Sequence, residues 1–392
     1  MKFATRLLNF DPAPGDRCTP ANTPIYQTAT FRQQDATEFG EYDYSRSGNP
    51  TRAVVEKQIA ALESGTRAFC FATGLAAITA VTRLVSPAEE ILACNDLYGG
   101  TYRLFSRILA KRGIIVRYAD FSNLEEVARC INPNTRLVYL ESPTNPLLQV
   151  IDIAAVSEIA HRSGALVCVD NSTMSPYLQR PLELGADIVL HSATKFLCGH
   201  SDVMAGAVAV NHDELAQELY LIQNGEGAGL SPFDSFLLLR GMKTLSLRLD
   251  RQQANAKLLA EFLSANPAVE RVYYPGVADE RQLRVHRSQS SGDGAVLSFV
   301  TGDAEFSRAV VEATKLFAIC VSFGGVNSTI SLPNYMSHAS IPTHLRQQKS
   351  IPADLVRISV GAEDADDLLE DLARAFASAS RQAETLRAIA AD

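Results

Sequence analysis

Short runs of consecutive apolar residues recur between residues 68 and 210 and lack the polar alternation of half-exposed strands. Such runs are typical of strands buried on both faces of a sheet. Most are separated by segments with helical spacing, such as Arg52 to Leu62 and Gly74 to Leu84. The pattern predicts an α/β fold with a mostly parallel, seven-stranded sheet covered by helices. The predicted strands are Ala68 to Ala72, Ile91 to Cys94, Ile114 to Tyr118, Leu137 to Leu140, Leu166 to Asp170, Ile188 to His191 and Ala205 to Val210.

A second pattern of this kind follows a long helix, which we expect to begin near Pro232 and to run through Arg240 toward Lys257. The closing helix is opened by Glu363 and Asp364, whose charges suit a helix N-terminus. The pattern predicts a smaller C-terminal α/β domain. Its expected elements are strands at Val269 to Tyr274, Ala295 to Val300 and Leu355 to Val360, and a helix near Ala304 to Thr314.

Residues 1–50 are rich in Pro, Thr and Asn and have weak periodicity, so we expect an extended arm. The chain of 392 residues is too long for one small core. We therefore predict an N-terminal arm at 1–50, a ligand-binding domain at 51–235 and a C-terminal domain at 236–392. The glycine-rich segment Asn224 to Gly229 matches neither a P-loop nor a dinucleotide fingerprint, and we expect a flexible loop there.

Composition narrows the function classes. A net charge of −8 argues against nucleic acid or an anionic membrane as a partner. No apolar run reaches the length of a membrane span, and Met1 to Phe10 lacks the features of a signal or transit peptide. The seven cysteines form no C-x-x-C pair, and several lie inside apolar runs, which indicates buried free thiols in a reducing compartment. We expect a soluble, cytoplasmic protein.

Lys195 is the most informative single residue. It follows a predicted buried strand, two hydroxyl residues precede it at Ser192 and Thr194, and Gly199 follows. An amine drawn into such a place can have a depressed pKa and attack a carbonyl. The cofactor that uses such a lysine most often, through a Schiff base, is pyridoxal 5'-phosphate (PLP). The alternative is a structural lysine just beyond a strand.

PLP needs further groups, and the chain offers a candidate for each. Asp170 ends a predicted strand, where ligands lie in open α/β sheets, and its carboxylate suits the pyridine nitrogen. The turn Thr73-Gly74-Leu75 follows a strand and opens a helix, as phosphate-binding turns do. The alternatives are a helix-capping aspartate and an ordinary strand-to-helix turn. Ser192 and Thr194 add hydroxyl donors or cap a helix.

Tyr98 and Arg357 complete the set. Tyr98 stands before two glycines, where an aromatic ring can stack on a planar cofactor and its phenol can move protons, although most loop tyrosines only pack. Arg357 interrupts a strand-like run, where a guanidinium can hold a substrate carboxylate or simply face outward.

Two other readings of the Lys195 region find less support. Ser192 and Lys195 fit the S-x-x-K pattern of serine acylases, but the companion S-D-N and K-T-G motifs are missing. His191 and His200 flank the lysine, but no carboxylate or thiol falls at metal-ligand spacing, so we assign no metal.

Longer motifs resemble those of the Cys/Met-metabolism family of PLP enzymes, which have the aspartate aminotransferase type of fold (fold type I). The likeness runs from about Thr23 to Asp371. The motifs that carry it are Tyr42 to Arg52, Glu141 to Pro146, Arg180 to Asp187, His191 to Lys195 and Ser337 to Pro342.

The resemblance implies roles for individual residues. Lys195 would carry the cofactor and move protons, Asp170 would pair with the pyridine nitrogen, and Tyr98 would stack on the ring. Tyr44 and Arg46 would reach the phosphate site of a neighbouring subunit, in a homotetramer built as a dimer of active dimers. Asn145 would contact the 3-hydroxyl side of the cofactor ring. The implied phosphate ligands are Thr73, Gly74, Leu75, Ser192 and Thr194, and the implied substrate contacts are Tyr98, Asn145, Ser322 and Arg357.

Members of the family differ in the bond that they break. Methionine γ-lyases carry a cysteine where this chain has Gly100, and cystathionine γ-enzymes usually carry a glutamate where it has Asn327. The segment Asp170 to Pro176 resembles plant-type cystathionine β-lyases. The resemblance therefore implies a carbon–sulfur lyase that eliminates at Cβ of a small sulfur amino acid, with elimination or replacement at Cγ as the alternative. A non-catalytic homologue is a third possibility.

Overall fold

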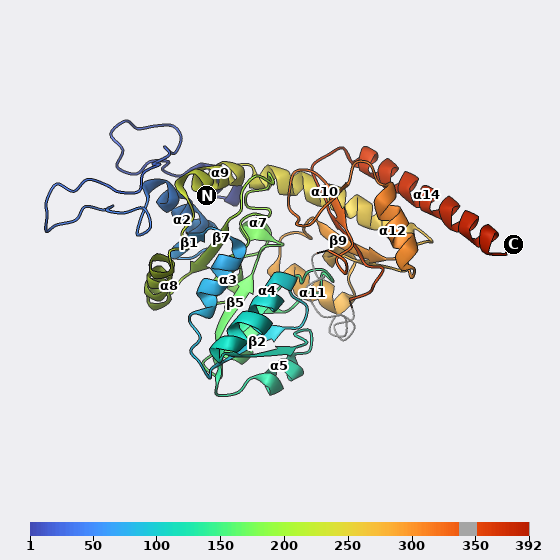
Figure 1. Ribbon diagram of the computed structural model, residues 1–392, viewed down its shortest axis with the longest axis horizontal. Coiled ribbons are helices and arrows are strands. Elements are labelled where there is room, and N and C mark those ends of the chain that lie inside the picture. The colour runs from blue at the N-terminus through green and yellow to red at the C-terminus, as the bar shows by residue number, and fades with distance from the viewer. Residues whose placement is uncertain (337–350, 392) are drawn as a thin grey trace.

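The large sheet contains all seven predicted strands. The structure, a computed structural model, describes residues 1–336 and 351–391, so the motif Ser337 to Pro342 lies outside the described residues (Figure 1). The strand order is β1-β7-β6-β5-β4-β2-β3, and only β7 runs antiparallel to its neighbours. The strands are β1 (Arg67–Phe71), β2 (Glu90–Cys94), β3 (Ile115–Ala119), β4 (Thr135–Glu141), β5 (Leu166–Asp170), β6 (Ile188–His191) and β7 (Gly206–Val210).

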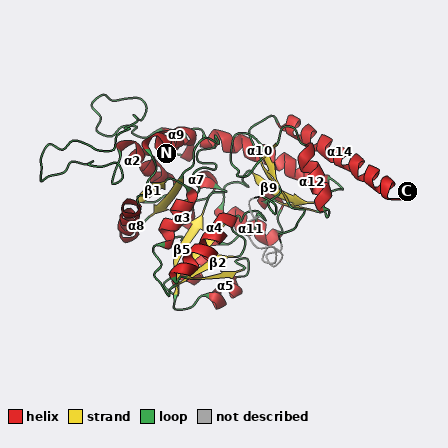
Figure 2. Cartoon of the chain, in the orientation of Figure 1, coloured by secondary structure: helices red, strands yellow, loops and turns green. Residues whose placement is uncertain are grey.

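Helices cover the strands, as Figure 2 shows. Phe69 and Cys70, neighbours on β1, belong to different hydrophobic clusters, because successive strand residues point to opposite faces of the sheet. Both faces are therefore buried, which explains the continuous apolar runs. The helices of this half are α2 (Pro50–Leu62), α3 (Gly74–Thr82), α4 (Gly99–Arg103), a π-helix at Leu104–Leu109, 3-10 turns at Ala110–Arg112 and Pro181–Leu184, α5 (Leu124–Cys130), α6 (Ile153–His161), α7 (Ser175–Leu178) and α8 (Asp213–Glu226).

A second, five-stranded sheet has the order β10-β11-β12-β9-β8 and confirms the second α/β pattern, while the domain limits at residues 50 and 235 stay predictions. Leu259, Phe299 and Leu372 belong to its core, which lies between this sheet and the last helices. Its strands are β8 (Arg271–Tyr273), β9 (Val296–Val300), β10 (Ala318–Ile319), β11 (Thr329–Ser331) and β12 (Val356–Ser359). The helices are α9 (Pro232–Met242), α10 (Leu245–Ala265), a 3-10 turn at Pro275–Val277, α11 (Glu280–Gln289), α12 (Ala304–Ala313) and α14 (Ala365–Ala391).

Two local predictions are wrong. The helix expected from Pro232 toward Lys257 is two helices, because Arg248 donates a hydrogen bond of 3.1 Å to the carbonyl of Gly241 and holds the chain at a break. The segment Asn224 to Gly229 is not simply a loop. Its first half continues α8 to Glu226, and Gly227 ends the helix with a left-handed φ of 76°.

The N-terminal arm is mostly irregular and extends away from the body as loops, apart from the short helix α1 (Phe3–Leu8) (Figure 1). None of the cysteines forms a disulfide. Cys70, Cys94, Cys168 and Cys198 are buried as predicted, but Cys18 is exposed and two others are partly exposed. No helix in the described part of the chain is long and apolar enough to span a membrane.

Candidate active site

A cavity of about 480 Å³ opens where the carboxyl ends of β4, β5 and β6 meet the loop at 321–323. This is the edge of an open α/β sheet at which ligands are expected. Of the predicted site residues, all but Tyr44 and Arg46 line it. The predicted residues that line it are Thr73, Gly74, Leu75, Tyr98, Asn145, Asp170, Ser192, Thr194, Lys195, Ser322 and Arg357.

Lys195 points its amine into this cavity from the turn after β6. The Nζ atom donates a hydrogen bond to the Ser322 hydroxyl and lies 4.9 Å from the centre of the Phe323 ring. Burial, and next the charge of Arg357, lower the pKa of Lys195 to about 8. A lysine with this pKa offers a useful fraction of neutral amine near neutral pH, as a nucleophile or base requires.

Asp170 lies on the floor of the cavity, and 8% of its surface is exposed. Burial raises the pKa of its carboxyl group, and three hydrogen-bond donors oppose that rise. Ser172 donates from its hydroxyl at 2.5 Å and from its backbone N–H at 3.0 Å, both to Oδ1. The Tyr139 hydroxyl donates to Oδ2 at 3.2 Å. These three hydrogen bonds favour the ionised carboxylate and fix its position, so that it can bind a cationic group.

The turn before α3 has room for a phosphate group. The Thr73 hydroxyl accepts a hydrogen bond of 3.0 Å from the N–H of Ala76 and so caps the helix. A Cβ atom at Gly74 would lie 2.9 Å from Ser192, so only glycine allows this approach. The Thr194 hydroxyl bonds to the backbone of Ala205 and does not cap a helix. The first N–H groups of α3 and the Ser192 hydroxyl therefore meet at one place in the cavity.

Arg357 is almost fully buried, with 2% of its surface exposed. It donates from Nη1 to the Asn145 side chain at 2.9 Å and from Nη2 to the backbone carbonyl of Ser322 at 2.7 Å. Its Nε atom has no hydrogen-bond partner among the described residues. A guanidinium held in this way beside the cavity suits a ligand carboxylate. Alternation along β12 thus does not turn Arg357 outward.

Tyr98 is 39% exposed and stands at the start of α4. Its backbone N–H donates to Glu141 Oε1 at 2.9 Å, which fixes the start of the helix to the end of β4. Its ring lies against Gly100, where an added Cβ atom would overlap the ring. Gly100 therefore has a physical role, because it leaves room for the Tyr98 ring. Asn327 is exposed and does not line the cavity.

Several residues on the cavity wall escaped prediction. Arg103 is the last residue of α4, the helix that Tyr98 precedes, and its spacing of five residues from Tyr98 does not mark a shared helix face. Met204 and Met336 come from distant loops, and nothing in their local sequence marks them. Tyr44 and Arg46 lie elsewhere, and Arg46 donates to the backbone carbonyl of Asn224 at 2.9 Å.

The residues of the cavity fit PLP. They include an amine of depressed pKa, a carboxylate held by three donors, a helix N-terminus next to a glycine, and a buried guanidinium that two hydrogen bonds hold in place. A family model described as "Cys/Met metabolism PLP-dependent enzyme" matches residues 4–377. The chain belongs to this family. It is thus an enzyme of Cys/Met metabolism whose cofactor is PLP.

Named relatives share most of the length of the chain. A chloroplastic cystathionine β-lyase of Arabidopsis thaliana is 54% identical over 95% of this chain and 80% of the relative. A cystathionine β-lyase of Bacillus subtilis is 49% identical over 91% of each chain. The crystal structure of a cystathionine γ-lyase from Lactobacillus plantarum, complexed with L-serine, superimposes with a TM-score of 0.93. It is 42% identical and covers 97% of this chain and all of its own. The fold is thus fold type I, as predicted.

Proposed function

We propose that this protein is a cystathionine β-lyase, which cleaves L-cystathionine into homocysteine, pyruvate and ammonia. One observation carries the proposal. Lys195, with a pKa near 8, shares a cavity with the Asp170 carboxylate and with the guanidinium of Arg357. The names of the relatives from Arabidopsis thaliana and Bacillus subtilis support the choice of reaction.

Each residue has a task in this reaction. PLP, when bound, supplies a carbonyl for amines and a ring that accepts electrons from Cα of the substrate. Arg357 holds the α-carboxylate and orients the Cα–H bond. Lys195 removes the Cα proton, and the Ser322 hydroxyl holds its amine in place. Asp170 stabilises a proton on the pyridine nitrogen, and the Tyr98 phenol lies on the cavity wall, where it can protonate the leaving sulfur.

The far end of cystathionine carries a second carboxylate. Arg103, the last residue of α4, is another cationic residue that lines the cavity besides Lys195 and Arg357. We assign it to that carboxylate. The cavity of about 480 Å³ falls within the usual size of small-molecule sites, which supports a substrate of this length.

The products test the proposal directly. Purified holoenzyme is incubated with L-cystathionine, and pyruvate, homocysteine, 2-oxobutyrate and cysteine are quantified by mass spectrometry. Cleavage at Cβ gives equal amounts of pyruvate and homocysteine. Release of 2-oxobutyrate and cysteine without pyruvate would instead identify a γ-lyase, and no turnover at all would exclude both.

We also propose that the active unit is a homotetramer, built as a dimer of active dimers, and that it works in the cytoplasm. The extended arm supports the assembly, because Tyr44 and Arg46 are exposed and do not line their own cavity. The absence of disulfides among the seven cysteines supports a reducing compartment. Sedimentation velocity tests the assembly, and an inactive Arg46→Ala variant mixed with inactive Lys195→Ala protein should regain part of the activity if sites are shared.

A further inference from the structure

A carboxylate and an imidazole form a buried pair behind the floor of the cavity. Glu63 directly follows α2, and His191 is the last residue of β6, immediately before Ser192. Glu63 Oε1 lies 2.5 Å from His191 Nε2, and the side chains are 0% and 1% exposed. Neither residue lines the cavity. The roles assigned so far do not account for this pair.

The pair is tied to Asp170 through several contacts. Asp170 on β5 pairs with Leu190, the residue before His191. The N–H of Ser192 donates at 2.6 Å to the Ser172 hydroxyl, which in turn donates to Asp170. Asn171, the neighbour of Asp170 in the chain, donates to Glu63 Oε1 at 3.1 Å. A charge on His191 also lowers the pKa of Asp170.

The hydrogen bonds are compatible with a charged pair. Glu63 Oε1 accepts from Asn171 and contacts the His191 ring, as an ionised carboxylate does, while Oε2 has no hydrogen-bond partner in the described part of the chain. A fully buried carboxylate is costly unless a cation lies beside it, and His191 is that neighbour. Charges would then alternate from α2 to the cofactor: negative at Glu63, positive at His191 and negative at Asp170.

We propose that Glu63 and His191 are positioning residues that act through Asp170: Glu63 holds a proton on His191, and this positive charge keeps Asp170 ionised toward the pyridine nitrogen of PLP. The proposal rests on the proposed role of Asp170. A buried ion pair adds little net stability to a protein. The contribution of this pair is instead the positive charge of His191, which lies behind the Asp170 carboxylate. It acts at short range in a place from which water is excluded, where a charge counts most.

The pyridine nitrogen itself reports the effect. Apoprotein is loaded with PLP labelled with ¹⁵N in the ring, and the ¹⁵N resonance gives the protonation state of that nitrogen. Glu63→Gln and His191→Gln each remove one charge and retain a hydrogen-bonding side chain. We expect both to move the resonance toward the unprotonated position and to weaken PLP binding about tenfold, as losses behind a ligand usually do.

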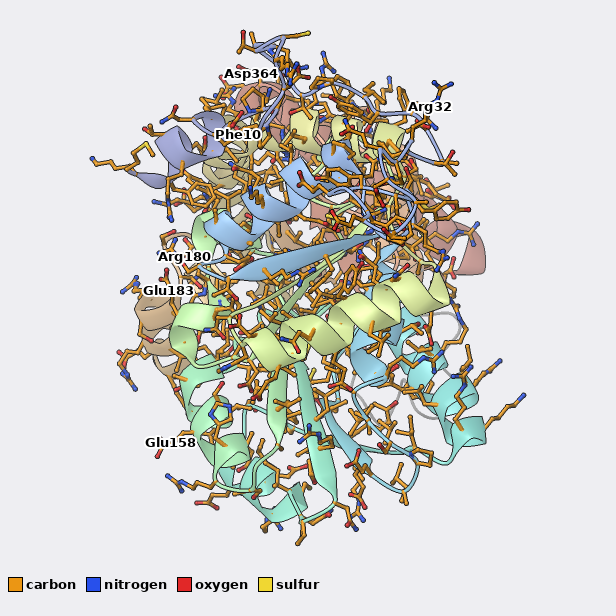
Figure 3. The ribbon with its side chains drawn as sticks, turned by 90° about the vertical axis from the view of Figure 1, so that its left-hand side faces the viewer. Phe10, Arg32, Glu158, Arg180, Glu183 and Asp364 are labelled. Carbon is orange, nitrogen blue, oxygen red and sulfur yellow. The ribbon has the colours of Figure 1, made fainter. Side chains whose placement is uncertain are left out.

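Two variants serve as controls. Glu90→Gln removes another buried carboxylate. Glu90 is 4% exposed and pairs with Arg117. It is the first residue of β2, whereas the cavity lies at the carboxyl ends of the strands. Glu183→Gln removes a surface carboxylate close to Glu63 in space, because Ser64 donates to it at 2.6 Å. Figure 3 shows Arg180 and Glu183 side by side at the surface, and they form an ion pair of 2.8 Å. Neither control should move the ¹⁵N resonance.

The double variant Glu63→Gln/His191→Gln separates charge from structure. Its two amides can hydrogen-bond to each other without charge, so it should fold even where a single variant does not, and it should show the same ¹⁵N change. A wild-type resonance in the double variant would overturn the proposal. The Asp170→Asn variant separates a failure of this inference from a failure of the role proposed for Asp170. If it changes the resonance and the Glu63 and His191 variants do not, only this inference fails. If it too leaves the resonance unchanged, the role of Asp170 in the proposed function fails.

Discussion

The floor and the wall of the cavity are built differently. The floor (Asp170, Ser172 and Ser192) consists of residues at the ends of strands or directly after them, where Asp170 accepts three hydrogen bonds. The wall (Tyr98, Arg103, Met204, Val321, Ser322 and Arg357) comes mostly from loops and a short helix. Val321 and Met204 are 55% and 67% exposed, and Ser322 has a left-handed φ of 82°. The sheet thus fixes the part that meets the cofactor, and loops shape the part that meets the substrate.

This difference explains why the family is easier to recognise than the reaction. PLP chemistry needs the same few groups in every member, and a sheet edge holds them in place. The choice between Cβ and Cγ depends on how the wall orients the substrate, where a small displacement has a large effect on rate. Substitutions in the floor and in the wall should therefore have separable effects, and the largest effect is expected at Lys195, which joins the two parts.

Lys195 lies between the floor and the wall, and its loss should have the largest effect. Lys195→Met removes the nucleophile and the base together, and we expect the rate of cystathionine cleavage to fall on the order of 10⁴-fold or more. Borohydride reduction of wild-type holoenzyme, followed by peptide mass spectrometry, should find the cofactor on Lys195. A reduced adduct on another lysine would contradict the assignment.

Arg357 is the most buried residue of the wall, and its substitution tests the contribution of the wall to substrate binding. Arg357→Lys keeps a positive charge but loses the planar fork that bonds Asn145 and Ser322, so we expect kcat/KM to fall about 100- to 1000-fold. Binding of PLP, measured by absorbance titration, should change much less, because the floor is intact. An equal loss of cofactor affinity would show that the two parts are not separable.

The same Lys195→Met variant should stabilise the apoprotein. The pKa of Lys195 falls from 10.5 to about 8 on folding, so the unfolded chain binds the extra proton between these values. Below pH 8 the buried charge costs about 3 kcal/mol, and this cost diminishes as the pH rises toward 10.5. Urea unfolding of both apoproteins should show a gain near pH 7 that is smaller at pH 9.5. A gain that does not depend on pH would contradict the shift.

Arg103 tests the outer part of the wall. Arg103→Gln removes the cation assigned to the distal carboxylate of cystathionine, and we expect the KM for cystathionine to rise about tenfold. S-Methylcysteine has no such carboxylate and serves as the matched control. A similar rise in KM for both substrates would remove the assignment.

The smallest expected effect concerns Gly100. Gly100→Cys places a Cβ atom where the Tyr98 ring lies, so the ring must move and kcat should fall severalfold, on the order of the loss of an aligned acid or stacking group. Gly225→Cys is the control, because beyond its chain neighbours and the nearby backbone of α8 no atom lies within 4 Å of the Cβ atom added there. A crystal structure of Gly100→Cys with Tyr98 unmoved would disprove this explanation.

Much of the floor could be predicted from the sequence, since its residues are marked locally. The apolar run before Asp170 and the hydroxyls before Lys195 both indicate the end of a strand. The break between α9 and α10 could not be predicted, because Arg248 bonds the Gly241 carbonyl from a position that its contacts with the carbonyls of Phe196 and Leu197 also fix, some fifty residues away. Glu63 lies 128 residues from His191, and no spacing rule connects them. Wall residues such as Met204 and Met336 meet only after folding.

The fate of deuterium tests the central claim most directly. Holoenzyme cleaves L-cystathionine in D₂O, and the products are examined by NMR. Elimination at Cβ requires only the Cα proton of the cysteine half, so the released homocysteine should carry no deuterium on carbon, and pyruvate should be the only oxo acid. Deuterium at C3 of 2-oxobutyrate, released together with cysteine, would show a proton shift at Cβ and would contradict the account.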